Sequence, residues 1–534
     1  MTNLLLLASV VIFACVLLHR LSARLGIPML LAFIVLGMLF GSDGIFKIPF
    51  ENYSFAENVC SFALIFIMFY GGFGTSWRQA RPSAGKAALL STLGVLFTAL
   101  LTGAFCHLVL RLDWLPSLLG GAVVSSTDAA SVFSILRYRR LGLKENTASL
   151  LELESGSNDP MSYMLTVAFI AMINGQAGPE SMFRLLFLQL VLGAAVGFAA
   201  AFFALFLLHH IRFDAAGFDM VFVAGAAIAS YAAAAAIEGN GYLATYITGI
   251  VLGNRRLRNK KELVHFFDGL TALMQMLLFF LLGLLSAPAR LPAFAGQAIL
   301  IFLFLTFLAR PAAVFTLLAP FGCRPRQILL ISFAGLRGAA SIVFAILAVQ
   351  GTSLGDTVFH ITFFIVLLSI LLQGSLLPWA ANHLGMVDSD NDVMKTFTDY
   401  SEDMPVQFIE FSIPEQHVWA GKTLREIELP PGTLAVLSER NGSSRVPNGD
   451  TVLCPGDRIV LGAAKPGEQS RVLLSEQVIR KNSEYIGKPL SALPKEENCL
   501  VILIERGMET IIPGGDVRLR EGDILVLNRG GEKD

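Results

Sequence analysis

Charged residues are scarce in this sequence. Only 15% of its 534 residues are Asp, Glu, Lys or Arg, and the mean hydropathy is +0.64. Soluble domains carry about 25% charged residues, so the composition excludes an ordinary soluble protein. The shortage is confined to residues 1–384, whereas residues 385–534 read as ordinary soluble sequence. The net charge of −1 gives no indication of nucleic-acid binding, and lipid is the expected surrounding of the first part.

Several short motifs are also missing. The six cysteines are scattered without a CxxC spacing, which argues against a disulfide framework or a zinc site. No GxGxxG follows a strand pattern in residues 385–534, so a Rossmann domain that binds NAD is excluded there. The apolar opening lacks a basic segment ahead of it, and we therefore expect a retained first helix rather than a cleaved signal peptide.

Long apolar runs fill residues 1–384. A helix needs roughly 20 apolar residues to cross a bilayer. Counted this way, the sequence predicts an all-α polytopic membrane protein with about thirteen transmembrane helices, of which the second and ninth are short. The predicted spans lie near 3–18, 28–41, 58–73, 87–110, 114–136, 148–173, 184–208, 218–237, 241–253, 264–286, 295–319, 327–349 and 357–380.

The distribution of Lys and Arg predicts the orientation. With the N-terminus outside, the inner loops hold seventeen Lys and Arg and the outer loops four. Cytoplasmic loops are enriched in these residues, so we expect a periplasmic N-terminus and a cytoplasmic C-terminal region. This layout suits the inner membrane of a bacterium.

The sixth span contains the strongest polar cluster, LELESGSNDP, in which Glu154, Ser155, Asn158 and Asp159 precede Pro160. Counted from the start of the span, Asp159 lies about 16 Å into the membrane. Ionisable residues at that depth are costly and usually mark a transport pathway. The proline removes a backbone donor and loosens the helix beside the carboxylate.

Two further spans look discontinuous. The fifth, GGAVVSSTDAASVF, has four consecutive polar residues at 125–128, and the twelfth, ISFAGLRGAASIVF, has Arg337 between Gly335 and Gly338. Broken helices at corresponding positions of two inverted repeats are the expected sign of a transport site at the membrane midplane. We expect Arg337 to pair with Glu154.

The expected charges of this region do not balance. Asp159 and Asp128 share one central arginine, so one negative charge is left for a proton or a bound cation. Glu152 lies nearer the cytoplasmic end and is expected to serve as a funnel or interface residue. Arg310, in the eleventh span, is expected to cap a helix or to extend towards the membrane surface.

Three motifs in this order carry a resemblance: SSTDAASVF (125–133), ESGSNDP (154–160) and GLRGAAS (335–341). Residues 1–384 resemble the monovalent cation:proton antiporter superfamily, specifically the NhaP-type sodium or potassium/proton exchangers. The resemblance implies that Asp159, Asp128, Thr127 and Ser155 bind the cation or the proton, and that Asn158 structures the site.

The same resemblance implies further properties. Glu154 and Arg337 match a buried salt bridge of the family. An Asn-Asp pair rather than Asp-Asp implies exchange of one cation for one proton. Family members are homodimers in which each protomer has a dimerisation domain and a moving core with crossed, broken helices. The physical mechanism would be competition of a proton and a hard cation for the same buried carboxylate.

The C-terminal region contains a repeat. Residues 415–463 match residues 481–529 without a gap, with 15 identities in 49 positions. Short β-rich runs and Gly-Asp turns predict two compact α/β domains, 403–469 and 470–534, behind a linker at 385–402. The first copy resembles the TrkA-C (RCK C-terminal) domain and the second a diverged relative, which implies dimerisation and binding of a small regulatory ligand. No other cofactor is expected.

The alternatives are a cation channel gated by the C-terminal region, a carrier for an organic ion, and an enzyme. No selectivity-filter sequence of the TVGYG type is present, which disfavours the channel. The mid-membrane acids have no nucleophile or metal cluster beside them, which disfavours an enzyme. We therefore expect an antiporter for pH homeostasis or cell-volume regulation. K⁺ is favoured over Na⁺ because TrkA-C domains belong to potassium-transport regulators.

Overall fold

A computed structural model gives the fold in two units, Met1–Glu402 and Asp403–Asp534. Some predictions extend beyond its described residues. They are the start of the first span, 3–8, most of the linker, from 389 onwards, and the ends of both predicted C-terminal domains. The described residues are 9–18, 29–138, 141–211, 216–255, 257, 259–353, 355–388, 406–440, 443–464, 474–479, 483, 485–493, 499–506, 509–511, 513–514 and 516–529.

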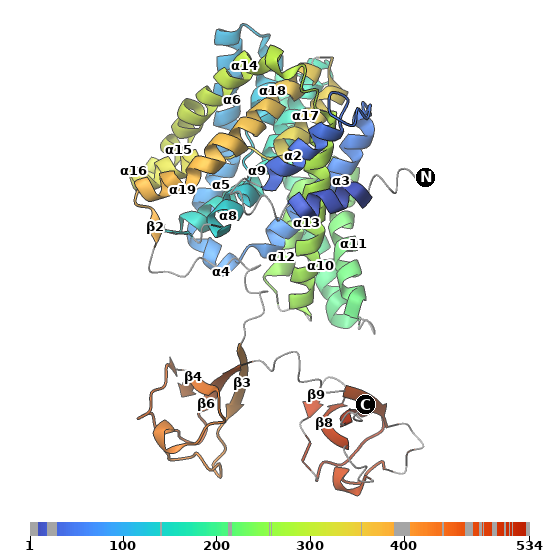
Figure 1. Ribbon diagram of the computed structural model, residues 1–534, viewed down its shortest axis with the longest axis vertical. Helices are drawn as coiled ribbons and strands as arrows, with labels where there is room; N and C mark the ends of the chain where they lie inside the picture. The colour runs from blue at the N-terminus through green and yellow to red at the C-terminus, as the bar shows by residue number, and fades with distance from the viewer. Residues whose placement is uncertain are drawn as a thin grey trace. The chain divides into compact units, whose positions relative to one another are not determined.

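The first unit is built from helices, and Figure 1 shows them packed side by side. They are α2 (Met29–Phe40), α3 (Tyr53–Gly74), α4 (Trp77–Ala80), α5 (Ala84–Leu89), α6 (Val95–Leu110), α7 (Trp114–Val123), α8 (Ala129–Tyr138), α9 (Thr147–Ile173), α10 (Pro179–His210), α11 (Ala216–Ala236), α12 (Gly241–Gly253), α13 (Lys260–Leu285), α14 (Leu291–Phe304), α15 (Arg310–Leu318), α16 (Pro325–Phe333), α17 (Ala339–Gly351), α18 (Gly355–Leu368) and α19 (Gly374–His383).

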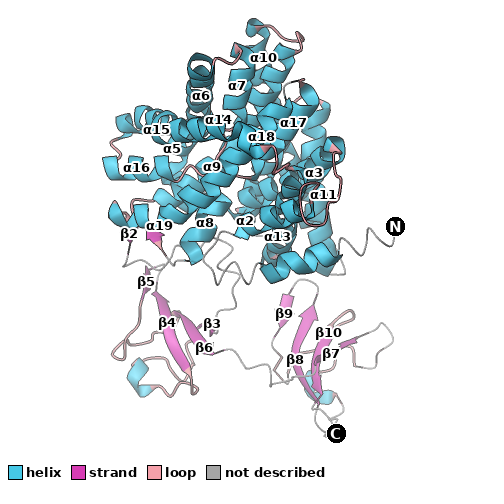
Figure 2. Cartoon of the chain, turned by 45° about the horizontal axis from the view of Figure 1, so that its top comes forward, coloured by secondary structure: helices cyan, strands magenta, loops and turns pink. Residues whose placement is uncertain are grey.

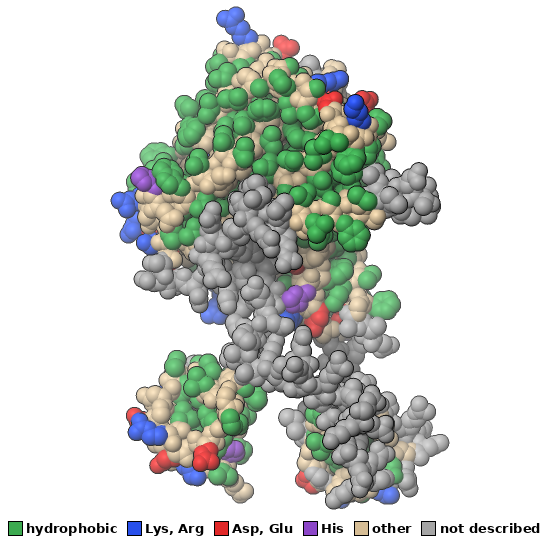
Figure 3. Space-filling view, in the orientation of Figure 1, with side chains coloured by type: hydrophobic (Ala, Val, Ile, Leu, Met, Phe, Trp, Pro, Cys, Tyr) green, Lys and Arg blue, Asp and Glu red, His purple; other side chains and the backbone are tan. Residues whose placement is uncertain are grey.

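This unit has the surface of a membrane protein. Seven of its described helices are long and apolar enough to cross a bilayer, and large apolar side chains such as Phe183 and Phe203 point outward, 77% and 64% exposed. Figure 3 shows hydrophobic side chains over most of the face of this unit. Five further apolar helices have 10–17 residues, among them the second and ninth predicted spans as α2 and α12. The total of thirteen crossings stays a prediction.

The helices form two packed groups. One contains α2, α3 and α10–α13, and the other contains α5–α9 with α14–α19. Small residues allow very close approach in the first group: a Cβ atom on Gly249 of α12 would lie 2.2 Å from the carbonyl oxygen of Phe69 on α3. Close backbone contact at glycine is the usual way for helices to associate in lipid, where no hydrophobic force drives them together.

Both predicted helix breaks are present. Residues 124–128 separate α7 from α8, and residues 334–338 separate α16 from α17. Three π-helical segments interrupt other long helices of the same group: η2 (Leu90–Gly94), η3 (Leu305–Ala309) and η5 (Ser369–Gln373). Segments of this kind occur frequently at functional sites. Hydropathy had given no sign of these three irregularities.

A short ribbon closes the first unit. Strand β1 (Gly142–Leu143), just before α9, pairs antiparallel with β2 (Val387–Asp388), just after α19. The main-chain amide of Lys144 also donates to the carbonyl of Met386. The loop between α8 and α9 is therefore tied to the chain at the end of the last membrane helix.

The second unit contains two four-stranded antiparallel sheets with the same strand order (Figure 2). The first is β3-β6-β4-β5 and the second β7-β10-β8-β9. Their strands are β3 (Val406–Ser412), β4 (Thr433–Arg440), β5 (Ser443–Arg445), β6 (Arg458–Ala464), β7 (Leu474–Val478), β8 (Cys499–Arg506), β9 (Glu509–Ile511) and β10 (Ile524–Arg529).

The repeat predicted from sequence is therefore a repeat of structure. Gly456 and Gly522 precede the last strand of each copy with φ of 85° and 84°, the left-handed conformation that the Gly-Asp turns require. The prediction of α/β domains needs correction. The described part of each copy has a single 3₁₀ turn, Leu424–Glu426 or Leu490–Ala492, and no α-helix.

Candidate cation-binding site

The two helix breaks meet inside the first unit. The main-chain amide of Asp128 donates to the carbonyl of Leu336 at 2.8 Å. A Cβ atom on Gly338 would lie 2.3 Å from a carboxylate oxygen of Asp128, so only glycine fits there without moving that side chain. The carboxylate of Asp128 also accepts from the amide and hydroxyl of Ser131, in the manner of a helix N-cap for α8. Asp128 is thus held by both broken spans.

Asp159 faces these breaks from α9. Its side chain is 6% exposed, and its carboxylate accepts a hydrogen bond from the Ser126 hydroxyl. Ser126 was recognised as part of the polar run but not as a site residue. Its distance of 33 positions from Asp159 left no signal in the sequence. The contact follows from the packing of α7 and α8 against α9.

The other predicted site residues also join the break to α9. The Asn158 amide donates to the Thr127 hydroxyl at 2.5 Å, and the Ser155 hydroxyl donates to the Thr127 carbonyl at 2.6 Å. Asn158 thus joins α9 to the break, and its structuring role stays a prediction. A serine that donates its proton keeps its oxygen lone pairs, so Ser155 retains the capacity to coordinate a cation.

Arg337 does not pair with Glu154 as predicted. Its guanidinium donates to the carbonyls of Ser125 and Ser126, both at 2.7 Å. These carbonyls follow the C-terminus of α7, where the helix dipole favours a positive charge. The main-chain amide of Arg337 donates to the hydroxyl of Ser369, the first residue of η5. Arg337 therefore supports the break in the fifth span.

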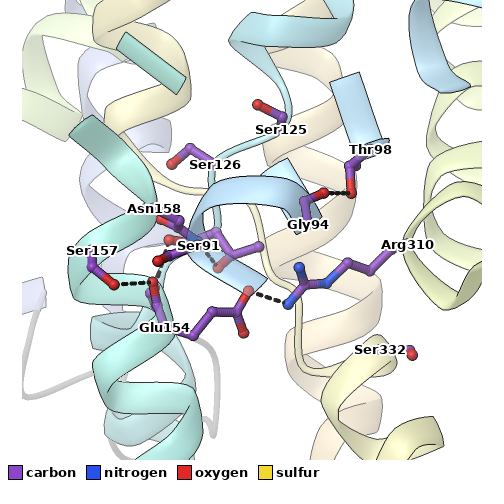
Figure 4. Close-up of polar contacts among 12 residues, drawn as sticks. Ser91, Gly94, Thr98, Ser125, Ser126, Glu154, Ser157, Asn158, Arg310 and Ser332 are labelled. Carbon is purple, nitrogen blue, oxygen red and sulfur yellow. Dashed lines mark hydrogen bonds and ion pairs between the residues drawn. The ribbon is translucent and has the colours of Figure 1, made fainter. Parts of the chain in front are cut away.

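Glu154 pairs instead with Arg310, as Figure 4 shows. The two charged atoms lie 2.5 Å apart, and the side chains of Glu154 and Arg310 are 1% and 2% exposed. The expectation that Arg310 caps a helix or reaches the surface is therefore wrong. The π-helical segment η3 ends directly before Arg310, whose side chain reaches Glu154 on α9. Hydropathy could not choose between two arginines in neighbouring apolar spans.

A cavity of about 490 Å³ opens beside these residues. Four predicted binding residues line it, and so do Glu152 and Asp268, with Tyr70 donating to Asp268 at 3.3 Å. The four are Thr127, Asp128, Ser155 and Asp159. The cavity thus brings carboxylate, hydroxyl and carbonyl oxygens together, which are the ligands that hard cations prefer.

The cavity is lined by more negative than positive charge. Glu154 and Arg310 neutralise each other, whereas the lining residues include no Lys or Arg and four carboxylates, those of Asp128, Glu152, Asp159 and Asp268. A monovalent cation or a proton would lower this negative charge. Within the described residues no group of three or more His, Cys, Asp or Glu side chains could hold a resident metal ion.

Sequence comparison places most of the chain in one family. The sodium/hydrogen exchanger transmembrane family matches residues 8–383. The chain belongs to the sodium/hydrogen exchanger family. The TrkA-C domain matches residues 408–467 and again 474–527, which confirms the predicted kind of both C-terminal copies.

Curated members of this exchanger family include similar proteins from several bacteria. A K⁺/H⁺ antiporter NhaP of Alkalimonas amylolytica is 39% identical over 66% of this chain, and the match covers 62% of that protein, less than two thirds of its length. A K⁺/H⁺ antiporter NhaP2 of Shewanella oneidensis is 35% identical over 86% of this chain and 81% of its own length.

The exchanger fold is also found among solved structures. The sodium proton antiporter MjNhaP1 from Methanocaldococcus jannaschii superposes with a TM-score of 0.63 and 23% identity, over 71% of this chain and 99% of that one. The exchanger described here is therefore a multi-pass membrane protein with this fold and with a TrkA-C region that follows it.

Proposed function

We propose that this exchanger moves a monovalent cation across the membrane in exchange for H⁺. The observation that carries the proposal is the cavity lined by Asp159, Asp128, Thr127 and Ser155, whose lining contains carboxylates but no Lys or Arg. The curated relatives named K⁺/H⁺ antiporters support the same reading and favour K⁺, with Na⁺ as the second candidate.

In the proposed mechanism, the proton and the cation compete for the carboxylates of Asp159 and Asp128. The site carries one negative charge fewer when it holds either one than when it holds neither. A charged site is costly to carry across an apolar barrier, so only the occupied forms change sides. One cation then exchanges for one proton, and transport is electroneutral.

The remaining parts of the proposal concern assembly and placement. We infer thirteen crossings arranged as inverted repeats, an inner bacterial membrane, a periplasmic N-terminus and a cytoplasmic TrkA-C region. The working unit is a homodimer whose C-terminal copies take a small regulatory ligand. The activity would serve pH homeostasis or cell-volume regulation.

The test is proton flux in proteoliposomes that contain an internal pH dye, with K⁺, Na⁺, Li⁺ or Rb⁺ added outside. Wild type is compared with Asp159→Asn and with Asp219→Asn, a matched change on α11 outside the cavity. We expect a saturable response that is lost only in Asp159→Asn and does not depend on voltage. Exchange that persists in Asp159→Asn would overturn the site, and voltage-driven flux without proton exchange would indicate a channel.

A further inference from the structure

A groove on the outside of the second helix group is distinct from the cavity just described. It encloses about 630 Å³ and is lined by η3, α15, α16 and one residue each of α6 and α14. Several of its side chains are strongly exposed, including Phe307 at 60%, Phe315 at 58% and Leu329 at 52%. The lining residues used below are Ala309, Pro311, Ala312, Pro325 and Ser332.

One end of the groove adjoins a cluster of positive charge. Pro325, a lining residue, lies between Arg324 and Arg326, both exposed. The Lys144 ammonium donates to the carbonyl of Gly385 at 3.3 Å, and the Arg326 guanidinium lies 3.6 Å from the Cβ position of the same glycine. Lys144, Arg324 and Arg326 therefore gather at the N-terminal end of α16.

Local contacts fix this cluster in place. Arg324 pairs with Glu145 at 2.8 Å, and the Gln327 amide donates to the carbonyl of Glu145 at 3.1 Å. Glu145 thus offsets the charge of Arg324, while Lys144 and Arg326 lie against the chain at Gly385. A basic cluster beside an apolar groove, at the expected cytoplasmic surface, has the chemistry that recognises an anionic lipid headgroup.

We propose that the groove binds one anionic phospholipid, with an acyl chain along α15 and α16 and the headgroup phosphate on Arg326 and Lys144. The groove runs from Pro325 to Ser332, about 10 Å along α16 at 1.5 Å per residue. A chain there packs against Ala309 and Pro311, the two neighbours of Arg310. The bound lipid thus covers the outer side of the helix turn whose inner side carries the Glu154 pair.

The test uses native mass spectrometry of the full-length protein with phosphatidylglycerol or phosphatidylcholine added at equal concentration. Arg326→Gln removes one headgroup contact, and Ala312→Phe fills the groove at an exposed alanine. The matched controls are Arg184→Gln on α10 and Ala232→Phe on α11, both at exposed positions outside the groove. Retention of lipid does not require transport, so failure here is separate from failure of the proposed function.

We expect wild type and both controls to retain phosphatidylglycerol over phosphatidylcholine. Arg326→Gln should lower this retention about fivefold, since one basic side chain near a membrane surface contributes about 1 kcal/mol. Ala312→Phe should lower it as strongly. If only Arg326→Gln lowers the retention of phosphatidylglycerol, the protein attracts the headgroup without binding the acyl chain in the groove. That result would overturn the proposal. If Ala312→Phe dissociates a dimer and leaves lipid retention unchanged, the groove binds a second copy of the chain and not a lipid.

Discussion

The two units use the same chemical pair, an arginine with a carboxylate, in different ways. In the second unit the Arg440 guanidinium donates two hydrogen bonds of 2.7 and 2.6 Å to the Asp457 carboxylate. The Arg506 guanidinium donates two hydrogen bonds of 2.8 Å to the Asp523 carboxylate. Asp457 and Asp523 each accept a main-chain amide as well. These pairs are bidentate and satisfied, and they occupy equivalent positions in the two copies of the repeat.

The pair in the membrane unit is incomplete by comparison. Glu154 and Arg310 share one hydrogen bond, and among the described residues Glu154 Oε2 and Arg310 Nε have no partner. Unsatisfied polar atoms in a buried site are costly. A fully satisfied pair holds one structure, whereas a half-satisfied pair retains capacity to accept a new partner. We propose that the pairs of the second unit serve to stabilise the fold, whereas the membrane pair belongs to the proposed cation site.

Breaking the membrane pair should have the largest effect. Arg310→Gln leaves the Glu154 carboxylate buried without a counter-charge, and such changes cost about 3–5 kcal/mol. We expect a large fall in the thermal midpoint of the purified protein, measured by fluorescence. The control is Arg290→Gln, whose pair with Asp356 is 3.7 Å long and exposed, and which should change stability by less than about 1 kcal/mol. Equal thermal midpoints for Arg310→Gln and Arg290→Gln would contradict the conclusion that Arg310 balances the buried charge of Glu154.

Removing both charges of the membrane pair should be milder than removing one. In Glu154→Leu with Arg310→Met, apolar side chains of similar volume replace a pair whose desolvation is expensive, which is often neutral for stability. We expect the thermal midpoint to return close to that of wild type. A double variant as unstable as Arg310→Gln would mean that each side chain contributes independently of the other.

Breaking a pair in the second unit should have a smaller and local effect. Arg440→Gln removes two charge-assisted hydrogen bonds from Asp457, worth about 1.5–3 kcal/mol. Amide hydrogen exchange in β4 and β6 should accelerate about 10- to 150-fold, with β8 and β10 unchanged. Arg506→Gln should accelerate amide hydrogen exchange in β8 and β10 and leave β4 and β6 unchanged. Acceleration in both copies from one substitution would show that the repeats fold as one cooperative body.

Acid should weaken the second unit over a defined range. The hydrogen bonds from Arg440 and Arg506 lower the pKa of Asp457 and of Asp523 below the usual value of 3.8. A lowered pKa in the folded state means stabilisation that is complete above pH 3.8 and is lost as the pH falls through the lower value. Trp419 reports on the first copy once the other three tryptophans are replaced by Phe. As the pH is lowered below 3.8, the urea concentration at the midpoint of unfolding should fall. This fall should be smaller in Arg440→Gln.

Much of the membrane unit could be predicted because its signals are local. Apolar runs give helices, and four adjacent polar residues or a Gly-Leu-Arg-Gly sequence give a break. The partner of Glu154 could not be predicted, since Arg310 and Arg337 are both arginines within apolar spans. The choice between them depends on η3, a π-helical segment with no sequence signature. The Ser126 contact with Asp159 likewise depends on how two distant helices pack.

In the second unit, too, some features could be predicted from the sequence and others could not. The gapless match of 415–463 with 481–529 predicted two equivalent domains, and the shared Arg–Asp pair follows the same alignment. In the described part of those domains, 3₁₀ turns stand where the α/β prediction placed α-helix, because strand and turn patterns reveal little about the connecting segments. Local patterns thus identified the elements, whereas contacts between distant elements required the structure.

The ribbon of β1 and β2 has a consequence for the order of assembly. Leu143 pairs with Val387, which the ribosome adds much later. At about 5–20 residues per second, synthesis of the roughly 240 residues between them takes roughly 12–50 s. The loop that precedes the aspartate-bearing helix therefore waits for the last membrane helix before it reaches its final pairing. The ribbon is thus closed only at the end of membrane insertion, as the C-terminal repeats begin to be synthesised.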